Sequence, residues 1–153
     1  VQRLEPAHYA AIHRRLEQAL ADGALGVSLG LGYAPECFYT THELIRALAP
    51  LAGQSIPITV HMRQEGGGVV TAAQEMVEVA RALKAPVHIS HLKAMGRDNW
   101  GVKISRALAM LEQARQDNAE AMFSGHDIPA EKAAAMANRT LRKVHKKVGF
   151  VPR

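Results

Sequence analysis

Residues 56–63, with the sequence IPITVHMR, and residues 86–93, with the sequence PVHISHLK, decide the predicted fold of this chain. Each segment is a short apolar run that ends in a histidine, His61 or His91, and each has a basic residue two positions later. Short apolar runs separated by a helical pattern are typical of parallel strands joined by a helix. Both histidines would then lie at the carboxyl end of the sheet, where α/β proteins place their chemistry.

The same alternation of helix and strand continues on either side of these two segments. Apolar residues at helical spacing predict a helix over residues 6–22, and a short glycine-punctuated apolar segment predicts a strand over residues 24–31. Thr40 and Glu43 have the spacing of a capping box that begins the next helix. We therefore predict an α/β fold of parallel βα units. Three units cannot close a TIM barrel, which takes eight strands and about 250 residues.

The composition indicates a soluble globular protein. The chain has 153 residues, of which 48% are hydrophobic and 22% charged, enough to bury a core. We expect no membrane segment, because no apolar run approaches the roughly 18 residues that span a bilayer. The beginning of the chain does not have the build of a signal peptide, so we expect a cytoplasmic location. A single cysteine, Cys37, excludes an internal disulfide.

Positive charge is concentrated near the end of the chain. Residues 129–153 contain seven Lys or Arg residues and one Glu, whereas the remainder is close to neutral although the net charge is +5. We therefore divide the chain into residues 1–117 and a basic segment, residues 118–153, which contains a predicted helix from about 129 to 148. We do not expect nucleic acid as the main partner, and the lack of an aromatic residue among these basic residues before Phe150 disfavours recognition of single strands by base stacking.

On the residues alone, the two strand-end histidines allow two interpretations. Neutral imidazole is the commonest protein ligand for metals, but catalytic zinc usually has three protein ligands and two are apparent here. A metal site and an ordinary structural role therefore both stay open. The basic residues Arg63 and Lys93 could bind a substrate carboxylate or form salt bridges at the rim of the sheet. By strand alternation, we expect His88 to face the helix layer, opposite to His91.

Three motifs, taken together, resemble those of a known family. They are DGALGVSLGLGYAP at residues 22–35, HMRQEG at residues 61–66, and ISHLKA at residues 89–94 followed by NWG at 99–101. In order and spacing they resemble the N-acyl-D-amino-acid deacylases (D-aminoacylases) of the amidohydrolase superfamily. The resemblance covers about residues 15–117. It implies a partial metal-dependent TIM barrel, in the region of its strands four to six, and a small-molecule N-acyl-D-amino acid as the substrate of an amide hydrolase.

The resemblance also implies roles for single residues. His61 and His91 are similar to the ligands of a zinc ion (Zn2+) at the ends of the fifth and sixth barrel strands. The implied substrate-binding groups at the rim are Tyr33, Arg63 and Lys93. The family's catalytic aspartate has no clear counterpart, although the segment FSGHD at residues 123–127 resembles the end of the eighth strand and makes Asp127 a candidate for it. Glu65 would lie beside the substrate-binding groups.

Other family features have no counterpart, namely the His-x-His of the first strand and the cysteine ligand. We therefore predict an incomplete fragment that is a poor or inactive deacylase alone, and that could associate with a complementary chain or form an oligomer. The alternative is a non-catalytic α/β binding module whose basic tail contacts nucleic acid or an acidic partner.

Overall fold

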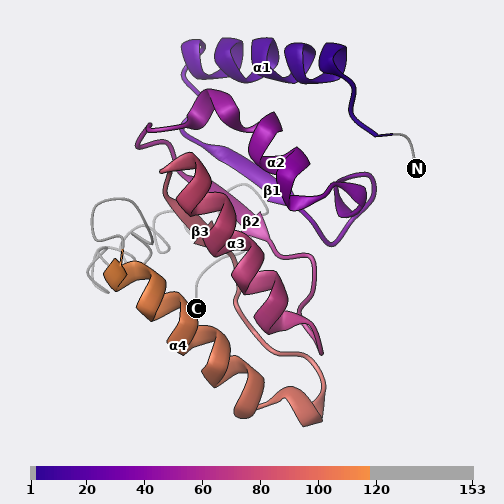
Figure 1. The fold of residues 1–153 in the computed structure, drawn as a ribbon, viewed down its shortest axis with the longest axis vertical. Coiled ribbons are helices and arrows are strands. Elements are labelled where there is room, and N and C mark those ends of the chain that lie inside the picture. Colours follow the sequence, from indigo (N-terminus) through magenta and orange to yellow (C-terminus); the bar gives the residue numbers. More distant parts are fainter. Residues whose placement is uncertain (1–2, 118–153) are drawn as a thin grey trace, which may run out of the picture. The chain divides into compact units, whose positions relative to one another are not determined.

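Three parallel strands form the centre of the fold. The computed structural model describes residues 3–117, which belong to the first of the two units into which the chain divides, Val1–Phe123. The strands β1 (Val27–Gly30), β2 (Ile58–His61) and β3 (Val87–Ile89) pair in the order β1-β2-β3, each parallel to its neighbour (Figure 1). The predicted α/β fold with parallel strands is confirmed. The predicted basic helix lies outside the described residues, as does Asp127.

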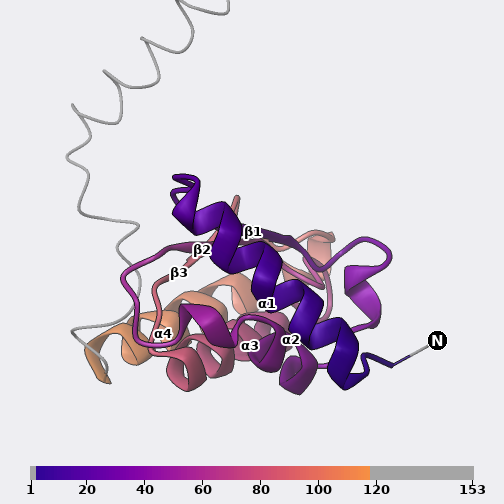
Figure 2. The same cartoon turned by 90° about the horizontal axis from the view of Figure 1, so that it is seen from above.

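Within residues 3–117, four α-helices alternate with these strands, as the apolar spacing predicted. Their bounds are α1 Pro6–Ala21, α2 Thr41–Ala47, α3 Val69–Leu83 and α4 Val102–Asp117. Helices α2, α3 and α4 lie next to one another in chain order on one side of the sheet, and α1 contacts α2 (Figure 2). None of the helices in the described part of the chain is long and apolar enough to cross a membrane.

The predicted capping box begins α2. The hydroxyl of Thr40 accepts a hydrogen bond from the backbone N–H of Glu43 at 3.2 Å, and the Glu43 carboxylate accepts one from the backbone N–H of Thr40 at 2.8 Å. These reciprocal bonds satisfy backbone donors that a helix start otherwise leaves unpaired. The helix ends at Ala47, and the following 3-10 turn, Ala49–Leu51, contains the proline that cannot continue it.

The sheet has one apolar and one polar face. Ile58 and Val87 lie in register on neighbouring strands and are almost completely buried beneath the helices. Thr59 and His88 follow them in register and point to the opposite face. Since His88 is exposed while its neighbour Val87 is buried, the expectation that His88 faces the helix layer is wrong.

Among residues 3–117, helix α3 supplies more of the buried apolar side chains than any other element. Its buried side chains recur every three or four positions: Val69, Ala72, Ala73, Met76, Val77, Val79, Ala80 and Leu83. Truncating Met76 or Leu83 to alanine would typically cost about 2 to 5 kcal/mol, so the packing of α3 holds the strands beneath it in place. The packing of α3 therefore limits movement of the carboxyl ends of β2 and β3.

Candidate metal centre

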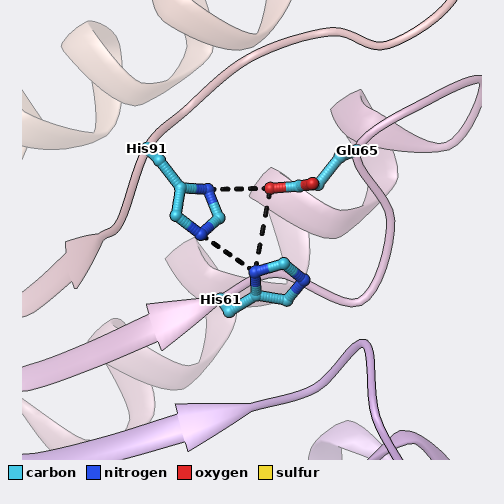
Figure 3. A group of neighbouring side chains, drawn as sticks. All are labelled: His61, Glu65 and His91. Atoms are coloured by element: carbon cyan, nitrogen blue, oxygen red, sulfur yellow. Dashed lines mark hydrogen bonds and ion pairs between the residues drawn. The ribbon is translucent and has the colours of Figure 1, made fainter.

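The structure brings His61 and His91 together at the carboxyl end of the sheet. His61 is the last residue of β2, and His91 follows the end of β3 by two residues. The Nδ1 atom of His61 lies 2.9 Å from the Nε2 atom of His91 (Figure 3). Two nitrogen ligands of one tetrahedral zinc, each bonded at about 2.0 to 2.1 Å, lie about 3.4 Å apart. A small opening of the pair would therefore make room for such an ion.

His91 has an unusual backbone conformation. Its φ angle is +41°, in the left-handed region that costs a non-glycine residue about 1 to 2 kcal/mol. Residues retained in such conformations concentrate at functional sites. The chain has left the extended conformation at this residue, so the alternation of β3 does not set the direction of the His91 side chain. The expected direction of the His88 side chain was inferred from that of His91 by strand alternation, and it was therefore wrong.

A carboxylate joins the histidine pair. The Oε1 atom of Glu65, in the loop after β2, lies 2.8 Å from Nδ1 of His91 and 3.9 Å from Nδ1 of His61 (Figure 3). The Glu65 side chain is only 10% exposed. A carboxylate can only accept, so Nδ1 of His91 is the donor in a hydrogen bond with Glu65, and Nε2 of that tautomer directs a lone pair toward His61. The three residues also place one potential ligand atom each within 4.8 Å of one another.

Lys93 neutralises this carboxylate. Its Nζ atom lies 2.5 Å from Oε1 of Glu65 and 3.1 Å from Nδ1 of His91. Burial raises the pKa of the Glu65 carboxyl, but the Lys93 hydrogen bond and charge, together with the two imidazoles, outweigh burial and hold the pKa below its ordinary value. The carboxylate therefore stays ionised at neutral pH, and the ammonium group of Lys93 lies at the edge of the site.

Tyr33 covers the other side of His61. The two rings stack with their centroids 4.8 Å apart and their planes 29° from parallel. The preceding residue, Gly32, approaches so closely that a Cβ atom there would lie 2.8 Å from Nε2 of His61. Real Cβ atoms do not approach this closely, so the position of the His61 ring depends on a glycine at this point.

Arg63 does not join the group. Its guanidinium donates to both oxygens of Glu75 in α3, at 2.9 and 3.0 Å, and not to the histidines or Glu65. Of the predicted site residues, the structure thus brings Tyr33, His61, His91 and Lys93 together. Sequence reasoning assigned no role to Gly32 and only a neighbouring place to Glu65. The one feature of the sequence that could have predicted a place for Glu65 in the site is its position four residues after His61, a histidine at the end of a strand.

The described fold is that of a segment of an amidohydrolase. It matches a solved D-aminoacylase, whose structure defines a subset of the amidohydrolases, with 35% identity and a TM-score of 0.69 over 74% of this chain and 24% of the other. It also matches the N-acyl-D-glutamate deacylase of Bordetella bronchiseptica, solved with zinc and a phosphonate inhibitor, with 32% identity and a TM-score of 0.70 over the same shares.

Sequence comparison relates the chain to a narrower group than the amidohydrolases as a whole. The chain is 36% identical to the D-aminoacylase of Alcaligenes xylosoxydans xylosoxydans over 137 residues, which are 86% of this chain. No family model matches the sequence. The resemblance found in the motifs is confirmed: the chain is homologous to a segment of the N-acyl-D-amino-acid deacylases, which are hydrolases of amide bonds. It spans 28% of the length of this D-aminoacylase.

Proposed function

We propose that this chain supplies His61 and His91 as zinc ligands in the active site of an N-acyl-D-amino-acid deacylase. The observation that carries the proposal is the 2.9 Å approach of Nδ1 of His61 to Nε2 of His91 at the ends of neighbouring parallel strands. The homology supports it, because the relatives are named as deacylases of N-acyl-D-amino acids and one was solved with zinc.

The residues present fit a zinc ion. Imidazole nitrogen is among the donors that zinc prefers, and Nδ1 of His61 and Nε2 of His91 converge, while the Glu65 carboxylate lies at the second nitrogen of His91. Zinc bound there would polarise the scissile carbonyl and lower the pKa of a bound water. In the reaction, water adds to the amide carbon, the C–N bond breaks, and a carboxylate and a free D-amino acid result.

The neighbouring groups have proposed roles in binding the substrate. The Lys93 side chain is 46% exposed, so its ammonium group can attract the α-carboxylate of an N-acyl-D-amino acid while it neutralises Glu65. The Tyr33 side chain is 63% exposed and lies over His61, where it can form one wall of the substrate site. Arg63 would bind substrate only by exchanging Glu75 for the substrate carboxylate. Asp127, the candidate catalytic aspartate, lies outside the described residues.

The whole-protein context is also a proposal. The three parallel strands and the similarity to D-aminoacylase support a place in strands four to six of a TIM barrel. The remaining strands could come from a complementary chain or another copy. A cytoplasmic location stays a prediction. On residues 3–117, no observation favours the alternative of a non-catalytic binding module.

Zinc uptake and substrate binding test the proposal. The chain should bind zinc, and a His61→Ala, His91→Ala double variant should not. The zinc-loaded chain should bind N-acetyl-D-methionine or N-acetyl-D-glutamate more tightly than their L enantiomers, with the preference reduced by Lys93→Gln. Wild-type protein that takes up no zinc, or that binds both enantiomers equally, would contradict the proposed function.

Hydrolysis tests the fragment hypothesis separately. We expect the chain alone to release amine from either D substrate no faster than the double variant, because a general base, typically worth 10²- to 10⁴-fold, is not assigned among the described residues. Faster release than this control would overturn the fragment hypothesis and direct attention to Glu65, Cys37 and Asp127.

A further inference from the structure

Arg63 makes a contact that the proposed chemistry does not use. It lies between His61 and Glu65 along the chain, yet its side chain turns away from both and meets Glu75 of α3. Its Nε donates to Oε2 of Glu75 at 3.0 Å and its Nη2 to Oε1 at 2.9 Å. This paired geometry is among the strongest contacts between side chains. The two side chains are 26% and 11% exposed, so solvent screens the pair less than it would a surface pair.

The same guanidinium holds a second segment of the chain. Its Nη1 donates to the carbonyl of Cys37 at 2.5 Å and its Nη2 to the carbonyl of Tyr39 at 2.7 Å. These carbonyls belong to residues 33–40, which lie between β1 and α2 and include Tyr33. Glu75 also accepts a hydrogen bond from the hydroxyl of Thr41, the first residue of α2, at 3.1 Å. The pair therefore ties the loop after β2 to α3 and to the segment between Tyr33 and α2.

This arrangement matters for Glu65. The loop after β2 contains three consecutive glycines, Gly66–Gly68, and glycine-rich loops lose more conformational freedom than others when they become ordered. Arg63 lies two residues after His61 and two residues before Glu65. Its hydrogen bonds to Glu75 therefore restrict the positions that the Glu65 carboxylate can occupy. The anchor on the Cys37 and Tyr39 carbonyls likewise limits the movement of Tyr33 over His61.

We propose that Arg63 and Glu75 are a positioning pair that sets the placement of Glu65, and through it the orientation of His91, for metal binding. The proposal rests on the proposed function, since the ion is the one that His61 and His91 are proposed to bind. It differs from the substrate-binding role expected for Arg63, because a positioning residue affects the metal site when no substrate is present.

Two readouts on the full chain test the pair, one without metal and one with Co²⁺ as the probe. Long-range ¹H–¹⁵N spectra of the metal-free protein report the protonated nitrogen of each histidine ring. The visible absorption of the Co²⁺-loaded protein reports ligand geometry and affinity. Arg63→Gln and Glu75→Gln should each change the ring signals of His91 and weaken Co²⁺ binding about 10- to 100-fold, as loss of an outer partner typically does.

Further variants separate positioning from general stability. Combining the two substitutions should weaken binding no more than the worse single variant, because both remove the same contact. Arg63→Lys keeps the charge but loses the paired geometry, so it should weaken binding less than Arg63→Gln, and it stands in for Arg63→Gln if that variant fails to fold. Arg81→Gln is the matched control, because it removes an exposed 3.3 Å pair with Asp117 and should leave both readouts unchanged.

Each outcome decides the proposal. Wild-type ring signals and Co²⁺ affinity in folded Arg63→Gln protein would overturn it and favour substrate binding by Arg63. Should the wild-type protein take up no Co²⁺, the proposed function fails, and the metal-free ring signals alone decide the positioning role. Equal effects of Arg81→Gln and Arg63→Gln would also overturn it, because the effect would then not be specific to this pair.

Discussion

The Oε1 atom of Glu65 lies 2.8 Å from Nδ1 of His91, on the edge of the ring away from the contact with His61. One imidazole thus has a carboxylate at one nitrogen and the other histidine at the second. Metal-binding histidines commonly donate their second N–H to a carboxylate, which fixes the ring and its tautomer. The geometry therefore favours Glu65 as the group that orients His91 over Glu65 as a ligand of the same ion.

Substitution of Glu65 distinguishes these two roles. Glu65→Gln keeps an oxygen that can accept the His91 N–H, whereas Glu65→Ala removes it. For an orienting residue we expect Glu65→Gln to weaken zinc binding less than Glu65→Ala, within the range of about 10- to 100-fold. Competition with a chelator measures the dissociation constants, and Glu78→Gln, at an exposed position of α3, is the control. Equal losses in both variants would instead identify the carboxylate as a ligand.

Single substitutions of the histidines should affect zinc more than the fold. His61 and His91 side chains are 24% and 48% exposed, so removing either should cost less stability than removing a fully buried side chain. We expect His61→Ala and His91→Ala each to lose more than the 10- to 100-fold in zinc affinity typical of outer partners. His88 lies in β3 and has an exposed side chain, so the His88→Ala variant should bind zinc as the wild type does. Calorimetric titration with zinc and thermal melts measure both quantities, and similar losses in all three variants would argue against the site.

Gly32→Ala should disturb the site through the His61 ring. The added Cβ would lie 2.8 Å from Nε2 and 3.0 Å from Cδ2 of His61, so the ring must shift. A misplaced ligand should weaken zinc binding by about tenfold or more, the lower end of the range for disturbed ligand orientation. At Gly67 a Cβ would meet its nearest neighbour, Nζ of Lys103, at an ordinary 3.6 Å, so Gly67→Ala is the matched control. Unchanged affinity in Gly32→Ala would show that His61 does not need its present position.

The features that follow local rules could be predicted from the sequence. Strand positions, the capping box at Thr40 and Glu43, and the convergence of His61 and His91 depend on short-range patterns and on the common direction of parallel strands. The directions of Arg63 and Glu65 could not be predicted, because the loop after β2 is neither extended nor helical and contacts far along the chain decide them. The prediction that His88 faces the helix layer was wrong for a related reason. It assumed that strand alternation continues to His91, but His91 has a left-handed backbone conformation.

Glu43 gives a pH-dependent prediction away from the metal site. Its carboxylate accepts hydrogen bonds from the backbone N–H and hydroxyl of Thr40 and pairs with Arg3 at 2.9 Å. The backbone hydrogen bond from Thr40 is the largest cause that lowers the pKa of Glu43 from its ordinary value of 4.5, against the opposing effect of burial. The folded state therefore favours the charged form, and the resulting stability is present above the unfolded pKa.

That stability should disappear as the pH falls through the folded pKa of Glu43. We expect the wild-type protein to melt at a higher temperature than Glu43→Gln at neutral pH, and the difference to shrink below about pH 4.5, the ordinary value. Thermal melts of both proteins across this range, with Glu78→Gln to account for other carboxylates, measure the difference. A difference that stays constant with pH would mean that Glu43 stabilises α2 through its shape and neutral hydrogen bonds and not through its charge.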